Sequence, residues 1–212
     1  MTESQFFDEL LLARPDLMQE MVSKSHMPNN QEIDRMVLHA QNQGIKVNVK
    51  DRDAMAKFYD IAANVYTDFI KELESNFAYI LKNMARKNEL PHQYFINISD
   101  HEAGMLLGDL IEPSTYEQYL SREYLELRAI GIDINEAIKM ISDGDFNTLE
   151  EAFNDFIERY VSILAERATK ATGVQYQEDD IIRKFEEKQL TLDNLIFTVE
   201  DTLIELYYIY KT

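Results

Sequence analysis

The feature that most constrains the fold is the segment 52–88, which contains neither glycine nor proline. Apolar side chains recur along it at spacings of three and four residues, which places them on one face of an α-helix. These residues are Met55, Phe58, Ala62, Val65, Phe69, Leu73, Phe77, Ile80 and Met84. The pattern therefore predicts one long central helix, around which the rest of the chain packs.

The rest of the chain shows the same helical spacing in shorter stretches. At five places a Ser, Asp, Asn or Thr stands three residues before a Glu, the pairing that forms a capping box at a helix start. The pairs are Asn29/Glu32, Ser99/Glu102, Ser114/Glu117, Asp133/Glu136 and Thr148/Glu151. Gly44, Gly131 and Gly144 are expected to end helices in the left-handed conformation. The expected helices are 4–13, 15–24, 30–43, 52–88, 101–111, 115–130, 134–142, 149–171, 178–189 and 192–210.

These helices predict an all-α fold, a compact multi-helix domain around the long helix at about 52–88. Six glycines and four prolines supply little turn chemistry, which disfavours an all-β architecture. Segments 45–49 and 94–98 alternate apolar and polar residues, so a minor two-stranded β-pair is a second expectation. We expect residues 1–50 to form a small N-terminal helical subdomain and residues 51–212 to form the main helical domain.

Charge is unevenly distributed along the chain. The sequence has 39 acidic and 21 basic residues, a net charge of −18. Residues 45–100 are neutral, whereas residues 101–212 carry 24 acids and ten bases, so the C-terminal half of the chain is strongly acidic. Repulsion from phosphates opposes nucleic-acid binding by such a chain. We therefore predict a protein partner with a basic surface, and no direct contact with nucleic acid.

Metal sites and catalytic motifs are not indicated. The absence of cysteine excludes thiolate metal sites and disulfides. The Glu89–His92 spacing resembles a di-iron motif, but Pro91 breaks the helix that this motif requires. A calcium-loop pattern from Asp143 fails because Thr148 replaces the required glycine and Asn154 the required glutamate. We predict a non-enzymatic protein without metal or cofactor, although an active site made by carboxylates of separate helices stays open.

The helix expected at 149–171 has two unlike faces. Leu149, Phe153, Phe156, Ile157, Tyr160, Ile163 and Leu164 share the apolar face. Carboxylates line up on the opposite side, where they form either a solvated face or a docking ridge. With the two acids of the preceding turn, the predicted partner-binding residues are Asp143, Asp145, Glu151, Asp155, Glu158 and Glu166.

Three functions are compatible with these features. The leading hypothesis is a regulatory or inhibitory protein whose carboxylates bind a basic surface and mimic the charge of a nucleic acid. The first alternative is a ligand-sensing or signalling domain with an apolar pocket between helices, lined by the many Phe, Tyr and Met side chains. The second is an oligomeric assembly or scaffold subunit. The last helix, 192–210, is apolar on more than one side, so it is either a core helix or the contact of a homodimer.

The N-terminus bears on localisation. It lacks a basic region, and its apolar stretch at 10–13 is too short for a signal peptide or a membrane span. We therefore expect a cytoplasmic protein that does not bind membranes.

Overall fold

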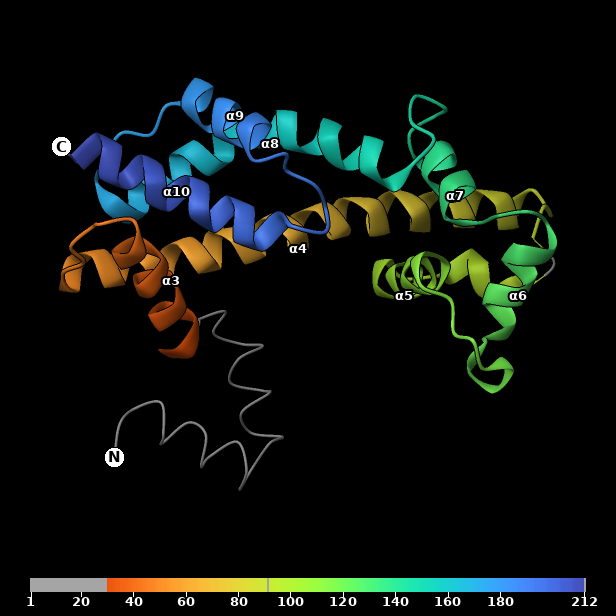
Figure 1. The fold of residues 1–212 in the computed structure, drawn as a ribbon. Helices are drawn as coiled ribbons and strands as arrows, with labels where there is room; N and C mark the ends of the chain where they lie inside the picture. Colours follow the sequence, from red (N-terminus) through yellow and green to blue (C-terminus); the bar gives the residue numbers. More distant parts are fainter. Residues whose placement is uncertain (1–29, 91, 212) are drawn as a thin grey trace. The chain divides into compact units, whose positions relative to one another are not determined.

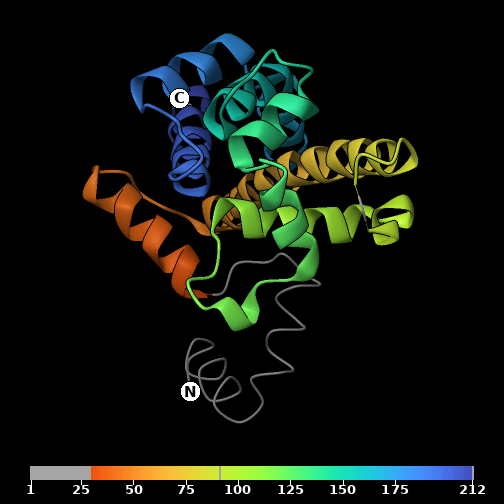
Figure 2. The same ribbon diagram turned by 90° about the vertical axis from the view of Figure 1, so that its right-hand side faces the viewer.

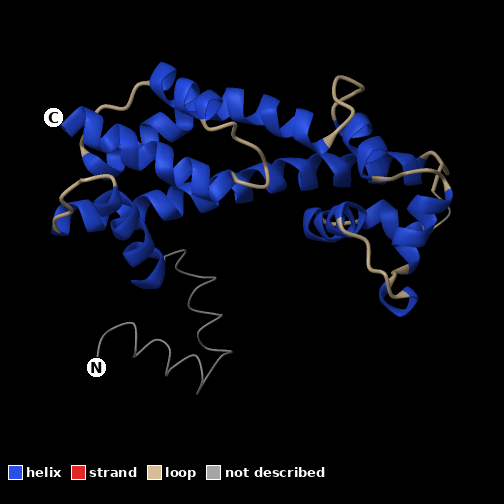
Figure 3. Ribbon diagram, viewed as in Figure 1, coloured by secondary structure: helices blue, strands red, loops and turns tan. Residues whose placement is uncertain are grey.

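The structure, a computed structural model, describes residues 30–90 and 92–211. These residues form eight α-helices and two short 3-10 helices, without a strand among them (Figures 1 and 3). The elements are α3 (Asn30–Asn42), α4 (Val49–Arg86), η1 (Gln93–Asn97), α5 (Asp100–Ile111), η2 (Glu117–Tyr119), α6 (Arg122–Ala129), α7 (Ile134–Ile141), α8 (Leu149–Thr172), α9 (Glu178–Glu187) and α10 (Leu195–Lys211). The all-α prediction is confirmed. The helices predicted at 4–13 and 15–24, and the Asn29 cap, lie outside the described residues.

The predicted long helix is α4, and its apolar stripe is buried from Met55 as far as Phe77. It begins three residues earlier than predicted because Asn48 and Asp51 cap it reciprocally. The Asn48 Oδ1 accepts from the Asp51 N–H at 3.0 Å, and the Asp51 carboxylate accepts from the Asn48 N–H at 3.1 Å. The helix ends where Asn88 adopts a left-handed conformation, with φ of 60°.

The minor β-pair predicted from 45–49 and 94–98 is not formed. Residues 45–48 are an irregular lead into α4, and residues 93–97 form η1. The His92 ring nitrogen Nδ1 accepts from the Tyr94 N–H at 3.0 Å, which starts a helical turn. Phe95 and Ile98, three residues apart, are then both fully buried. Burial of this pair on one side of a turn outweighs the alternating pattern.

The helix predicted at 115–130 is wrong in its first part. The Ser114 Oγ accepts from the Tyr116 N–H at 3.1 Å rather than capping a helix, and only the short η2 follows. The helix α6 starts later, at Arg122, where the Ser121 Oγ caps the Tyr124 N–H at 3.1 Å. The other predicted caps in the described residues form: Ser99 with Glu102, Asp133 with Glu136, and Thr148 with Glu151. The three predicted glycine stops all have positive φ.

The chain divides into two compact units. The first unit contains residues 1–66 and 160–212, and the second contains residues 67–159. The helices α4 and α8 each contribute residues to both units. The predicted subdomain at 1–50 stays a prediction, since more than half of it lies outside the described residues.

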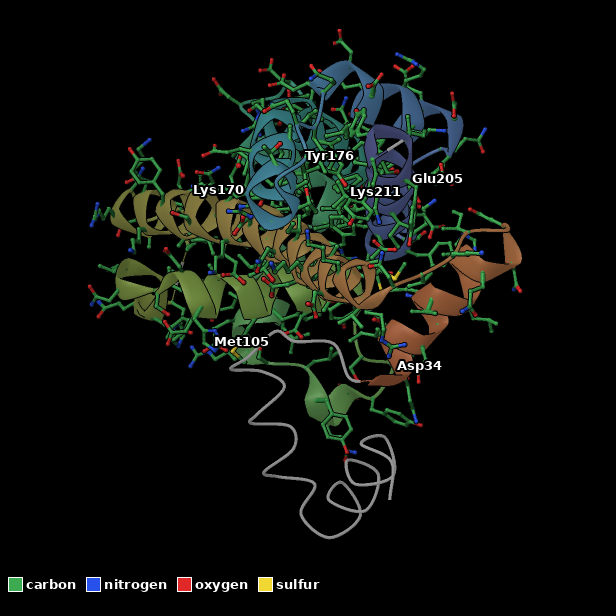
Figure 4. All side chains as sticks on the ribbon, turned by 90° about the vertical axis from the view of Figure 1, so that its left-hand side faces the viewer. Asp34, Met105, Lys170, Tyr176, Glu205 and Lys211 are labelled. Atoms are coloured by element: carbon green, nitrogen blue, oxygen red, sulfur yellow. The ribbon has the colours of Figure 1, made fainter. Side chains whose placement is uncertain are left out.

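In the first unit, α10 is the most deeply buried helix. Its buried residues run without interruption from Thr198 to Ile204. It packs against α9, and the buried Tyr176 hydroxyl donates to its Leu203 carbonyl at 2.6 Å. Tyr176 is labelled in Figure 4. Core burial thus accounts for most of the apolar surface of α10, while Ile196, Phe197 and Ile209 stay exposed. A homodimer through 192–210 remains a prediction.

In the second unit, the short helices α6 and α7 both contact α5 (Figure 2). Its Gly104 lies so close to the Glu74 side chain of α4 that a Cβ would collide with it. The start of α8 is anchored by aromatic packing, with the Phe69 ring centroid 5.4 Å from that of Phe153 and 5.2 Å from that of Phe156. These contacts leave the connection between α5 and α6, residues 112–121, on the surface.

Candidate functional site

Most of the excess acid belongs to the second unit. Residues 67–159 carry 19 acidic and eight basic side chains, a net charge of −11, whereas the first unit has a net charge of −7 on more residues. The charge is therefore not a property of the C-terminal half as such. It is concentrated in a unit that runs from the middle of α4 into α8.

Five of the six predicted partner-binding residues lie in this second unit. Asp143, Asp145 and Glu158 are exposed, and none of them has an ion-pair partner among the described residues. Glu151 is exposed as well, but its carboxylate accepts from the Asn147 N–H at 2.7 Å and so helps to begin α8. The partner-binding role predicted for these four residues stays a prediction.

Asp155 differs from the rest of the predicted ridge. Its carboxylate accepts from the Arg159 Nε at 3.0 Å, and the same guanidinium donates to Glu72 of α4 at 2.8 Å. The hydrogen bond with Glu72 raises the pKa of Arg159, with a further contribution from Asp155. The Asp155 carboxylate is therefore engaged in joining α8 to α4.

The last predicted residue, Glu166, belongs to the first unit, where it is exposed and lies 3.6 Å from the Lys170 ammonium group. An exposed pair of this kind leaves the charge of Glu166 largely solvated. The apolar face of α8 also needs one correction, because Ile163, predicted to be buried, is exposed. Of the carboxylates predicted to line up on α8, Asp155 is thus held by Arg159, whereas Glu158 and Glu166 are exposed.

A second candidate site, which was not predicted from the sequence, is the acidic segment 105–119. Four large apolar side chains are exposed there: Met105, Ile111, Tyr116 and Tyr119. The two tyrosines are 65% and 69% exposed, and their rings meet edge to face with centroids 6.1 Å apart. Three acids, Asp109, Glu112 and Glu117, stand among them, and the chain has no lysine or arginine from 88 to 121.

Local hydrogen bonds hold this segment in a defined shape. Pro113 prevents α5 from continuing, and the Ser114 hydroxyl then accepts from the Tyr116 N–H. The Tyr119 N–H donates to the Tyr116 carbonyl at 3.0 Å, which closes the turn of η2. On α5, loss of hydration raises the pKa of the Asp109 carboxyl. The Pro-Ser-Thr run indicates a turn at this position. The Ser114/Glu117 spacing also matches a capping box, however, and so predicted a helix instead.

Neither a metal-ligand cluster nor a membrane-spanning helix is found within residues 30–90 and 92–211. No group of three or more His, Asp or Glu side chains in this part of the chain is arranged to hold a metal ion. None of the described helices is long and apolar enough to cross a membrane. Comparison of the chain with protein families, curated proteins and solved structures finds no match.

Proposed function

We propose that the protein is a non-enzymatic regulator or inhibitor that docks on a basic surface of a partner protein through the segment 105–119. One observation carries this proposal. Two exposed tyrosines and two exposed aliphatic side chains lie in a stretch that contains three acids and no base. The partner it fits is a protein whose surface combines lysine or arginine side chains with shallow apolar pockets.

The two kinds of side chain have different tasks in such a contact. Tyr116 and Tyr119 supply large, fairly rigid rings with a polar tip, the residue type that dominates the energetics of many protein interfaces. The carboxylates of Glu112 and Glu117 attract a basic partner and disfavour an acidic one, so they act mainly on association rate and selectivity. Apolar side chains surrounded by acids therefore favour a partner whose surface has basic side chains beside apolar pockets.

The exposed acids Asp143, Asp145 and Glu158 add to the negative field of the same unit. A protein that binds nucleic acid has a groove built for a row of negative charges, and carboxylates can occupy such a groove in place of phosphates. We therefore propose nucleic-acid mimicry as the means of inhibition. Duplex DNA should then compete with this protein for the partner.

The test begins with affinity purification from the host cell at low salt, followed by identification of the proteins that elute as salt is raised. The Kd of the purified partner is then measured for the wild type and for the double variant Tyr116→Ala/Tyr119→Ala. We expect the double variant to bind at least about tenfold more weakly, because anchor residues typically contribute about 2 kcal/mol or more.

The matched control is Tyr79→Ala, which removes a tyrosine of the same unit that is 66% exposed but lies on α4, one turn before Lys82. This control should bind like the wild type. Equal effects of the two changes, or none from either, would contradict docking through 105–119.

A further inference from the structure

A hollow of about 470 Å³ lies in the first unit, where side chains of α3, α4 and the start of α10 meet. Its volume is within the range of about 300–1,000 Å³ that small-molecule pockets occupy. The residues that give it chemical character are Arg35, Tyr59, Tyr66, Asp193, Phe197 and Glu200. It is separate from the acidic segment 105–119, which belongs to the other unit.

The charged pair in this hollow has no net charge. The carboxylate of Glu200 is completely buried and accepts from the Arg35 guanidinium at 2.7 Å. The same guanidinium lies over the Phe197 ring, 5.2 Å from its centroid. In this hollow, the protein's own Arg35 cation is therefore bound by an aromatic face and a carboxylate together.

Asp193 sets the sign of the remaining charge. It is exposed at the start of α10 and has no ion-pair partner among the described residues. With the Arg35–Glu200 pair neutral, the lining as a whole is negative, and the unit around it is negative as well. An anionic ligand is therefore disfavoured, and a cation is favoured.

The aromatic walls are only partly used by the protein itself. The side chains of Tyr66 and Phe197 are 45% and 49% exposed, although both border a well-packed core. Aromatic rings attract organic cations because the face of each ring carries negative charge density. The larger hollow of about 630 Å³ beside α8 lacks such walls, since its aromatic residue, Tyr176, is buried and bonded to Leu203.

We propose that this hollow binds a small organic ammonium ion with an apolar body. The ammonium group is held between the aromatic rings near Asp193, and the apolar body lies against Leu192 and Ile196. The proposal goes beyond docking through 105–119 and does not depend on it.

The probe for the test is benzyltrimethylammonium, measured by titration calorimetry and by NMR shifts of the full-length protein. Benzyl alcohol and benzoate serve as the neutral and the anionic control compounds. We expect a Kd in the millimolar range or tighter for the ammonium ion, at least about tenfold weaker binding of both control compounds, and shifts confined to residues near 35, 59–66 and 192–200.

Two variants locate the site. Tyr66→Leu and Asp193→Asn change exposed side chains, and each should weaken binding of the ammonium ion at least about threefold while the unfolding temperature stays near that of the wild type. The matched control Tyr79→Leu, in the other unit, should bind like the wild type. The proposal is overturned if benzoate binds as well as the ammonium ion, if no binding occurs at about 20 mM probe, roughly twentyfold above a Kd of 1 mM, or if the control loses as much affinity as Tyr66→Leu.

Discussion

In the first unit three buried or half-buried acids are held by cations, whereas in the second unit five acids between 112 and 158 are exposed without such partners. Glu200 pairs with Arg35, Glu205 pairs with Lys188 at 2.7 Å, and the buried Asp51 accepts from Lys211 at 2.8 Å. Glu112, Glu117, Asp143, Asp145 and Glu158 form no ion pair with any described residue. Glu200, Glu205 and Asp51 therefore stabilise the first unit internally, whereas these five acids of the second unit remain available to a partner. Net charge alone does not reveal this difference.

The largest effect should come from the buried carboxylate of the first unit. Asp51→Ala removes the ion pair with Lys211, the acceptor of the Asn48 N–H in the reciprocal cap of α4, and the acceptor of the Tyr207 hydroxyl, which lies 3.0 Å away. We expect the free energy of unfolding to fall by about 3 kcal/mol. Urea unfolding followed by circular dichroism measures this change. Asp53→Ala, an exposed site on the same helix, should change it by less than about 0.5 kcal/mol. Similar losses from both variants would contradict the role given to Asp51.

The next largest effect is expected in the pH dependence of the free energy of unfolding. Burial alone raises the pKa of Glu205, but hydrogen bonds and charge from Lys188 and Lys184 lower it below the usual 4.5. A carboxyl whose folded-state pKa is depressed stabilises the protein above its unfolded-state pKa, and this contribution disappears as pH falls through the folded-state pKa. Between about pH 5 and 3, Glu205→Gln should therefore lose about 1 kcal/mol less stability than the wild type.

The control for this measurement is Glu186→Gln, which changes an exposed acid of α9 without an ion pair among the described residues. Its curve of unfolding free energy against pH should follow that of the wild type. If the Glu205→Gln curve also runs parallel to that of the wild type, the interaction of Glu205 with its lysines contributes nothing to the pH dependence of stability.

An acid of the second unit that does form an ion pair sharpens the comparison. Asp155 shares the Arg159 guanidinium with Glu72, so Asp155→Asn should destabilise the unit, but only by about 0.5–1 kcal/mol because the network is partly exposed. Hydrogen exchange of the α8 amides between 149 and 159 measures this loss. Glu158→Gln, one turn along the helix, should leave the same amides unchanged. Faster exchange in the Glu158→Gln variant would mean that Glu158 is also structural.

The smallest effect on stability is expected in the segment 105–119. Glu112→Gln/Glu117→Gln removes two exposed charges that no described cation balances, so the free energy of unfolding should change by no more than about 0.5 kcal/mol, with a gain if self-repulsion matters. Thermal unfolding provides the measurement. A large loss of stability would place these acids in the same structural class as those of the first unit.

The sequence predicted the features that depend on neighbouring residues. The stripe of α4, the stops at Gly44, Gly131 and Gly144, and the cap at Ser99 each follow from residues within a few positions of one another. The failure at Ser114 has the same origin, because its spacing to Glu117 matches a capping box although Pro113 turns the chain away.

The features that were not predicted depend on distant parts of the chain. Arg35 meets Glu200 across 165 positions, and Tyr207 meets Asp51 across 156, so neither pair leaves a local pattern. Exposure of Tyr116 and Tyr119 likewise depends on which face of the second unit its other helices cover. Among the acids predicted at 143–158, only the fold separates Asp155, which pairs with Arg159, from the exposed Glu158, which has no ion pair among the described residues.

The most direct test of the central claim is the salt dependence of the Kd for the partner protein, measured for the wild type and for Glu112→Gln/Glu117→Gln. Exposed charges are screened over about 10 Å at 0.1 M salt, so the affinity of the wild type should fall steeply as salt rises. The variant should bind several-fold more weakly at low salt, with a shallower dependence that meets the wild type at high salt. Binding that is independent of salt, or equal slopes for the two proteins, would contradict docking through the acids of 105–119.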